Sequence, residues 1–160
     1  MSGTVNVVDV TYAQTGASVN TDALGMREMQ QRVFEQRDAQ HLLVKAPPAS
    51  GKSRALMFVA LDKLENQGVG KAIVCVPETS IGASFRSTDL TSHGFFADWQ
   101  VDPRWNLCLS GAEDGVTSGK VRAVRDFMAS GDRVLVCTHA TFRFAVDRFG
   151  VEAFDDCLIA

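Results

Sequence analysis

The chain has 160 residues, of which 46% are hydrophobic and 22% charged, and its formal net charge is −3. This length and composition are typical of one soluble domain with a proper hydrophobic core. The small negative charge argues against tight stand-alone binding to nucleic acid. No apolar run approaches the ~20 residues of a membrane span. The N-terminus also lacks the features of a signal peptide, so we expect a cytoplasmic protein without a membrane partner.

The first half of the chain alternates between predicted strands and helices. Residues 4–12 alternate imperfectly between apolar and polar side chains and predict a strand, followed by a loop to Asn20. A helix is expected after Thr21 or Asp22 as N-cap, with one apolar face made by Met26, Met29, Val33 and Phe34. A strand at 42–45 and a helix to about Asn66 follow, and the turn at 68–70 ends that helix. We therefore divide the chain into an N-terminal strand and loop extension (1–20) and a domain (21–160).

The second half continues the alternation. We expect a strand at 72–76, a short helix around 80–87, a long loop at 88–104, a strand at 105–109, a helix at 118–129, a strand at 133–137, a helix from Thr138 or His139, and a strand at 157–160. The helix at 118–129 should turn Val121, Val124, Phe127 and Met128 inward. Almost unbroken apolar strands separated by helices predict a parallel sheet covered on both faces. The fold class is therefore α/β, a three-layer domain with a mainly parallel sheet.

Several residue types that often mark function have a simpler interpretation here. The cysteines are too far apart for a zinc knuckle, and we interpret them as small apolar core residues: Cys75, Cys108, Cys137 and Cys157. The aromatic residues between 95 and 105 have few basic neighbours, so we expect them to pack in the core or a loop rather than stack on bases.

The segment 41–60 carries the strongest functional signal. An apolar strand leads into the turn APPASGKS (46–53), and a helix follows. The N–H groups of such a turn and the dipole of the following helix attract an anion, so we expect a nucleoside triphosphate there. Lys52 would reach the outer phosphates, and the Ser53 hydroxyl would bind Mg²⁺. The loop residues expected around the phosphates are Pro48, Ala49, Ser50 and Gly51. A plain polar turn between strand and helix remains the alternative.

The order and spacing of these motifs over residues 24–160 resemble the first RecA-like domain of superfamily 2 helicases and translocases. This DEAD/DEAH-type group includes the motor subunits of restriction enzymes. Four segments carry the resemblance: Arg-Glu-Met-Gln at 27–30, the turn at 46–53, Val-Pro-Glu-Thr at 76–79 and Val-Cys-Thr-His-Ala-Thr-Phe at 136–142. Leu-Ser-Gly at 109–111 is weakly similar to a glycine-containing motif of the family.

The resemblance implies a role for each matching residue. Arg27 and Gln30 correspond to the adenine-sensing element, so they are expected to bind the adenine of ATP. Lys52 would be the catalytic lysine of the phosphate-binding loop. Pro77, Thr138 and Thr141 correspond to positions that contact the nucleic-acid backbone. The implied partner is nucleic acid, with DNA favoured over RNA, and the implied cofactors are ATP and Mg²⁺.

The sequence also departs from the family. The acidic Asp-Glu-x-x motif should follow a strand such as 157–160, whereas Asp155 and Asp156 precede it and are expected to close a turn. The Ser-Ala-Thr strand and the second RecA-like domain are missing as well. We therefore expect a partial helicase ATP-binding domain, truncated before the acidic motif, with a gap or an unpaired edge in its sheet. Such a chain should bind nucleotide weakly and hydrolyse it poorly.

Two other functions remain open. A small P-loop phosphotransferase would need acceptor-site arginines and a lid, and no such basic cluster follows residue 53. A non-catalytic truncated remnant would bind a partner or nothing. The sequence does not indicate an oligomeric state.

Overall fold

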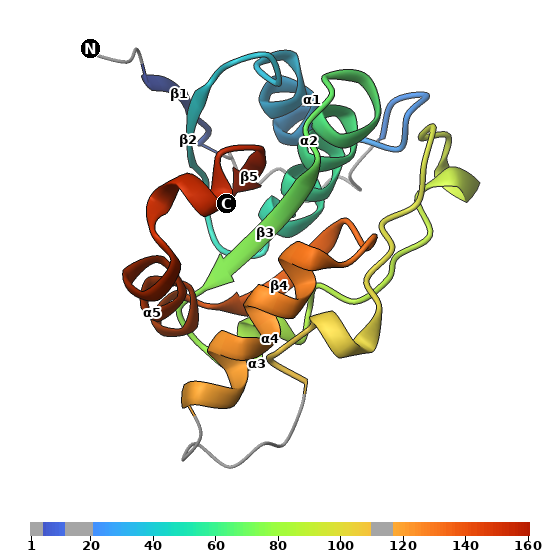
Figure 1. The fold of residues 1–160 in the computed structure, drawn as a ribbon. Helices are drawn as coiled ribbons and strands as arrows, with labels where there is room; N and C mark the ends of the chain where they lie inside the picture. The colour runs from blue at the N-terminus through green and yellow to red at the C-terminus, as the bar shows by residue number, and fades with distance from the viewer. Residues whose placement is uncertain (1–4, 12–20, 110–116) are drawn as a thin grey trace. The chain divides into compact units, whose positions relative to one another are not determined.

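Figure 1 shows a computed structural model of the chain, which describes residues 5–11, 21–109 and 117–160. The chain divides into two compact units. Unit 1 comprises Met1–Lys63 and Asp89–Asp98, and unit 2 comprises Leu64–Thr88 and Trp99–Ala160. The predicted loop from residue 12 to Asn20 lies outside the described residues. None of the described helices is long and apolar enough to cross a lipid bilayer.

Unit 1 is built on two parallel strands that lie side by side, β1 (Val5–Asp9) and β2 (His41–Lys45) (Figure 1). Two helices also belong to this unit, α1 (Glu28–Glu35) and α2 (Lys52–Asn66). Helix α2 is part of unit 1 as far as Lys63. The strand predicted at the N-terminus is confirmed. One set of its side chains is buried with residues of both helices in an apolar cluster: Val8, Val10, Met29, Val33, Ala55 and Val59. Strand β1 is therefore part of the core of unit 1.

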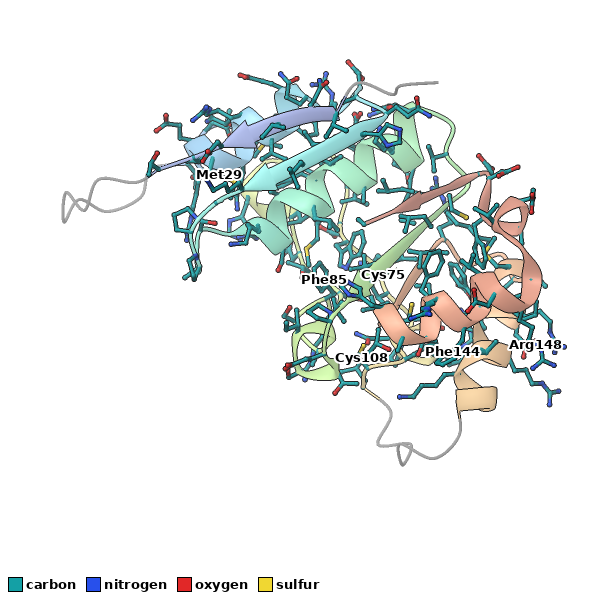
Figure 2. The ribbon with its side chains drawn as sticks, turned by 90° about the vertical axis from the view of Figure 1, so that its left-hand side faces the viewer. Met29, Cys75, Phe85, Cys108, Phe144 and Arg148 are labelled. Carbon is teal, nitrogen blue, oxygen red and sulfur yellow. The ribbon has the colours of Figure 1, made fainter. Side chains whose placement is uncertain are left out.

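Helix α1 begins later than the sequence predicts. The Asp22 carboxylate accepts hydrogen bonds from the N–H groups of Leu24 (2.9 Å) and Met26 (2.8 Å), but it closes a turn rather than a helix. Arg27 is the N-cap, and its N–H donates to the side chain of Gln30. The predicted apolar face is confirmed in part: Met29, labelled in Figure 2, and Val33 are buried and Phe34 is half-buried on α1, whereas the buried Met26 precedes the helix.

The segment Asp89–Asp98 returns to unit 1 from a distant part of the sequence. It contains a short 3₁₀ helix, η1 (Thr91–His93), and anchors itself through the buried side chains of Leu90 and Phe95. The Phe95 ring lies 4.6 Å from that of Phe58, between ring centroids. The sequence predicts only a long loop here, because nothing local indicates the packing partner of these residues.

Unit 2 has a three-stranded parallel sheet in the order β4–β3–β5, where β3 is Lys71–Val76, β4 is Val134–Thr138 and β5 is Cys157–Ile159. Helices α4 (Thr117–Ala129) and α5 (His139–Phe149) pack on it, with the 3₁₀ helix η3 (Val151–Phe154) before β5. Of the residues of α4 predicted to point inward, Val121, Val124 and Phe127 are buried and Met128 is half-buried. All named strands pair in parallel, and the described strands form one sheet in each unit.

The predicted strand at 105–109 is wrong. The chain instead forms a 3₁₀ helix, η2 (Pro103–Trp105), and then a single bridge from Asn106 to Val136. The buried Asn106 amide donates to the carbonyl of Gly82 (3.1 Å), and its oxygen accepts from the N–H of Cys108 (3.1 Å). These bonds turn the chain away from the sheet after one residue. The helix expected around 80–87 is correspondingly short, α3 (Thr79–Gly82).

The cysteines fit their interpretation as core residues in part, since Cys137 is buried and the other three are half-buried. All four are free thiols, and Cys137 on β4 lies opposite Cys75 on β3, which Figure 2 labels. A hydrogen bond with the Cys75 thiol and burial both raise the pKa of Cys137. Burial also raises the pKa of Cys108. Protonated, buried thiols behave as small apolar groups. The aromatic residues expected in the core are buried too (Phe95, Trp99 and Trp105), whereas Phe96 is exposed.

Candidate functional site

The candidate site in unit 1 is the loop that joins β2 to α2. The chain leaves β2 at Lys45, and α2 begins at Lys52. Two loop residues have positive φ, Ala49 (60°) and Gly51 (90°). The carbonyl of Gly51 accepts the N–H of Ala55 (3.0 Å), which begins the hydrogen-bond ladder of the helix. The loop therefore wraps back on itself directly before the N-terminus of α2, where free N–H groups concentrate.

The Lys52 ammonium group folds over this loop. Its Nζ donates to the carbonyl oxygens of Ala46 and Pro47, both at 2.8 Å, and the residue is exposed. The positive charge is thus held at the surface of the loop by two neutral acceptors. An anionic oxygen is a stronger partner for an ammonium group than a neutral carbonyl.

Ser50 is an exception to the usual pairing of buried polar atoms. The residue is 7% exposed, and among the described residues its hydroxyl has no hydrogen-bond partner. Buried hydroxyl groups are nearly always paired, and an unpaired one calls for an explanation. Ser50 lines a cavity of about 550 Å³ together with the rest of 49–54, Thr21, Gly25, Arg27, Gln30 and His93. A ligand in this cavity would explain the unpaired hydroxyl.

Gln30 connects helix α1 to the loop. It is 2% exposed, its Nε2 donates to the carbonyl of Gly51 (3.1 Å), and its Oε1 accepts from the N–H of Arg27 (2.9 Å). A Cβ on Gly51 would lie 2.6 Å from Gln30 Nε2, so only glycine permits this close approach. The structure brings Arg27 and Gln30 to the loop, and the Gln30 amide holds the backbone of the loop in place.

The remaining predicted residues of this site divide into two groups. Ser53 is half-buried and lines the cavity beside Lys52. Pro48 is exposed and is not among the residues that line the cavity. No group of three or more His, Cys, Asp or Glu side chains is placed to hold a metal ion within 5–11, 21–109 or 117–160.

Sequence reasoning missed four residues that line the cavity: Thr21, Gly25, Arg54 and His93. Gly25 has a φ of 75°, and a Cβ there would lie 2.8 Å from the Cβ of His93. Arg54, in the first turn of α2, donates to the carbonyl of Asp89 at 3.5 Å. Gly25 in a short turn was a usable signal for positive φ. No sequence signal connects His93 to the loop, because the contact depends on tertiary structure.

In unit 2 the predicted nucleic-acid residues meet at one edge of the sheet. Val76 lies opposite Thr138, so Pro77 and helix α5 leave the sheet at the carboxyl ends of adjacent strands. The Thr138 hydroxyl accepts the N–H of Thr141 (3.3 Å) and donates to the Thr141 hydroxyl (3.1 Å), capping α5 as predicted. Figure 2 shows the exposed Phe144 and Arg148 further along this helix.

Two other sequence predictions are only partly covered. Asp155 and Asp156 form the turn between η3 and β5, as expected. In the weak motif at 109–111, residue Leu109 is exposed, and the two residues after it lie outside the described residues.

One curated protein was found to be similar to this chain. It is named "Putative ATP-dependent helicase YeeB", from Bacillus subtilis (strain 168), and is 57% identical over 155 residues. The match covers 97% of this chain and 25% of the relative, so the chain spans about a quarter of that protein's length. No family model matches the chain, and no solved structure matches it. The chain is therefore similar, over almost its whole length, to one quarter of a protein with that name.

Proposed function

We propose that this chain is the ATP-binding part of an ATP-dependent nucleic-acid helicase or translocase of superfamily 2. The observation that carries the proposal is the cavity of about 550 Å³ at the start of α2, lined by Lys52 and by the unpaired buried hydroxyl of Ser50. The name of the relative supports ATP as the nucleotide and helicase as the general class. The parallel α/β architecture of both units is compatible with a RecA-like domain.

In this proposal the loop 46–53 is a phosphate-binding loop. The phosphates would take the place of the carbonyls of Ala46 and Pro47 as acceptors for Lys52, and the Ser50 hydroxyl would donate to a phosphate oxygen. Gly51, with a φ of 90°, would help the loop backbone to turn its N–H groups toward the phosphates. Ser53 would be the protein ligand of Mg²⁺, which neutralises charge on the phosphates when it is bound. Arg27 and Gln30 would contact the adenine side of the nucleotide.

The nucleic-acid surface would lie in unit 2. Pro77, Thr138 and Thr141 share the carboxyl edge of the sheet, where the N-terminus of α5 attracts phosphate groups. Arg143 and Arg148 are exposed on the same helix and would add positive charge to this surface. We propose DNA rather than RNA as the partner. Hydrolysis would need an acidic motif and an arginine finger from further parts of a longer protein.

Calorimetry with MgATP tests the proposal. The unmodified chain should bind MgATP, and Lys52→Ala should lose binding because the ammonium group that faces the phosphates is gone. Lys45→Ala is the matched control, since its side chain is 78% exposed and pairs with Asp9 outside the cavity. Equal MgATP binding by Lys52→Ala and the unmodified chain would contradict a phosphate-binding loop here.

A further inference from the structure

We propose that the segment Asp89–Asp98 forms the wall of the cavity that receives the ribose and purine base, and that His93 contacts the base. This inference rests on the proposed function, because it takes the occupant of the cavity to be a nucleoside triphosphate. It concerns a segment that lies far from the loop 46–53 in sequence but belongs to unit 1 in space.

The segment Asp89–Asp98 is packed into unit 1. Leu90 is fully buried and Phe95 is 4% exposed, and the Phe95 ring also lies 5.8 Å from the ring of Phe34. The Asp98 carboxylate accepts the N–H groups of Leu90 and Thr91, both at 2.8 Å, which closes the segment on itself. His93 therefore belongs to a segment that is held in place by buried side chains and hydrogen bonds.

Two glycines allow the segment Asp89–Asp98 to lie against residues 21–27. A Cβ on Gly25 would lie 2.8 Å from both the Cβ and the carbonyl oxygen of His93, and a Cβ on Gly94 would collide with the carbonyl oxygen of Ala23. Arg54 connects the other end of the segment to α2 through the carbonyl of Asp89. The segment is thus held both at the turn before α1 and at the first turn of α2, on either side of the cavity.

The position of the phosphates decides what His93 can reach. The loop, Lys52 and the N-terminus of α2 offer the N–H groups and the positive charge, so the triphosphate belongs at that end. The unpaired Ser50 hydroxyl independently indicates a ligand there. A cavity of about 550 Å³ is large enough for a ligand bigger than a triphosphate alone. The lining residues left for the ribose and base are Thr21, Gly25, Arg27, Gln30 and His93.

His93 and Arg27 suit a purine base. Both side chains are exposed, and both end in flat groups that stack on bases, an imidazole ring and a guanidinium group. The imidazole nitrogens can also hydrogen-bond to a base edge or a ribose hydroxyl. The structure therefore assigns His93 to recognition of the nucleoside and not to the phosphates.

The experiment compares two ligands, MgATP and inorganic tripolyphosphate with Mg²⁺, in competition against a fluorescent ATP analogue. Replacing His93→Ala should weaken MgATP by about tenfold, the usual effect of losing one stacking partner. Tripolyphosphate affinity should change by less than about twofold, because it lacks a base to stack. Ser92→Ala is the matched control, since its exposed side chain neighbours His93 outside the cavity lining, and it should change neither affinity. Thermal unfolding without ligand would show that all variants fold alike.

The other outcomes of this experiment contradict either the role of His93 or the proposed function. Unchanged MgATP affinity in His93→Ala, or an equal loss for MgATP and tripolyphosphate, would overturn the assignment of His93 to the nucleoside. Absence of MgATP binding by the unmodified chain, or binding that survives Lys52→Ala, would overturn the proposed function itself. The two failures are therefore distinguishable in one set of titrations.

Discussion

The side-chain amide of Gln30 donates to the carbonyl of Gly51 across 3.1 Å, joining helix α1 to the loop before α2. The same side chain accepts the N–H of Arg27, so one buried amide satisfies two backbone groups. Buried polar side chains with both ends paired fix the backbone around them. Gln30 therefore determines the shape of the loop even when no ligand is bound.

Replacing Gln30→Ala should lower the free energy of unfolding by about 1–3 kcal/mol, because two partly buried backbone groups lose their hydrogen-bond partner. MgATP binding should weaken as well, since the Gly51 carbonyl is no longer held. Urea denaturation and calorimetry measure the two effects. Gln31→Ala is the control, because Gln31 is only half-buried and its one bond, to the carbonyl of Met26, is long at 3.5 Å. Equal effects of the two substitutions would contradict this role of Gln30.

Strand β1 offers a second test with a neighbouring control. Val8 is 6% exposed and packs in the core of unit 1, whereas Val7 is 60% exposed on the other face of the strand. Val8→Ala should cost about 1–3 kcal/mol of unfolding free energy. Val7→Ala should cost less than about 0.5 kcal/mol. Both values come from urea titrations followed by circular dichroism, and similar costs would mean that β1 does not use this face to pack.

Substitutions at Thr138 test whether its hydroxyl caps α5 and supports the binding of nucleic acid. Thr138→Ala removes the cap of α5 and should cost about 1 kcal/mol of unfolding free energy. Thr138→Ser keeps the hydroxyl and should retain both the stability and the binding of labelled DNA, measured by fluorescence anisotropy. A Thr138→Ser variant as unstable as Thr138→Ala would show that the hydroxyl is not the stabilising group.

Asp98 makes the segment Asp89–Asp98 sensitive to acid. Hydrogen bonds from the N–H groups of Thr91 and Leu90 lower the pKa of Asp98 below its ordinary value of 3.8. The carboxylate therefore stabilises the folded segment at pH values above the unfolded pKa, and this contribution is lost as the pH falls through the lower, folded pKa. Asp98→Ala should be less stable than the unmodified chain at pH 7, and the difference should shrink once the pH falls below the ordinary aspartate pKa of 3.8. Urea titrations at about pH 7 and about pH 3 that give the same difference would contradict this linkage.

Local patterns were enough for much of the fold. The apolar run in β2, the long apolar face of α2 and the Thr138 cap of α5 each have a short-range signal, and all three were predicted from the sequence. The loop 46–53 was located in the same way. The identities of its ligand and of the nucleic-acid partner remain predictions.

One local turn and two long-range contacts explain what the sequence did not reveal. Asp22 looks like a helix cap in sequence, but its carboxylate closes a separate turn with Leu24 and Met26 before α1. The apolar residues near 107 look like a strand, but the side chain of Asn106 bonds to Gly82 and ends the pairing with β4. His93 reaches the cavity only because Gly25 and Gly94 let two distant segments touch. The last two contacts join segments far apart in sequence, so no single local window of sequence contains both partners.

Thr88 and Trp99 pair backbone to backbone, with N–H to carbonyl distances of 2.8 and 3.1 Å, at the two ends of the segment Asp89–Asp98. Unit 1 therefore cannot be completed until this segment, which follows its strands and helices in the sequence, has been synthesised. A nascent chain that ends after α2 would carry Phe34 and Phe58 without the Phe95 ring that packs on them. Because this segment supplies His93, the lining of the cavity is complete only once the chain includes residues 89–98.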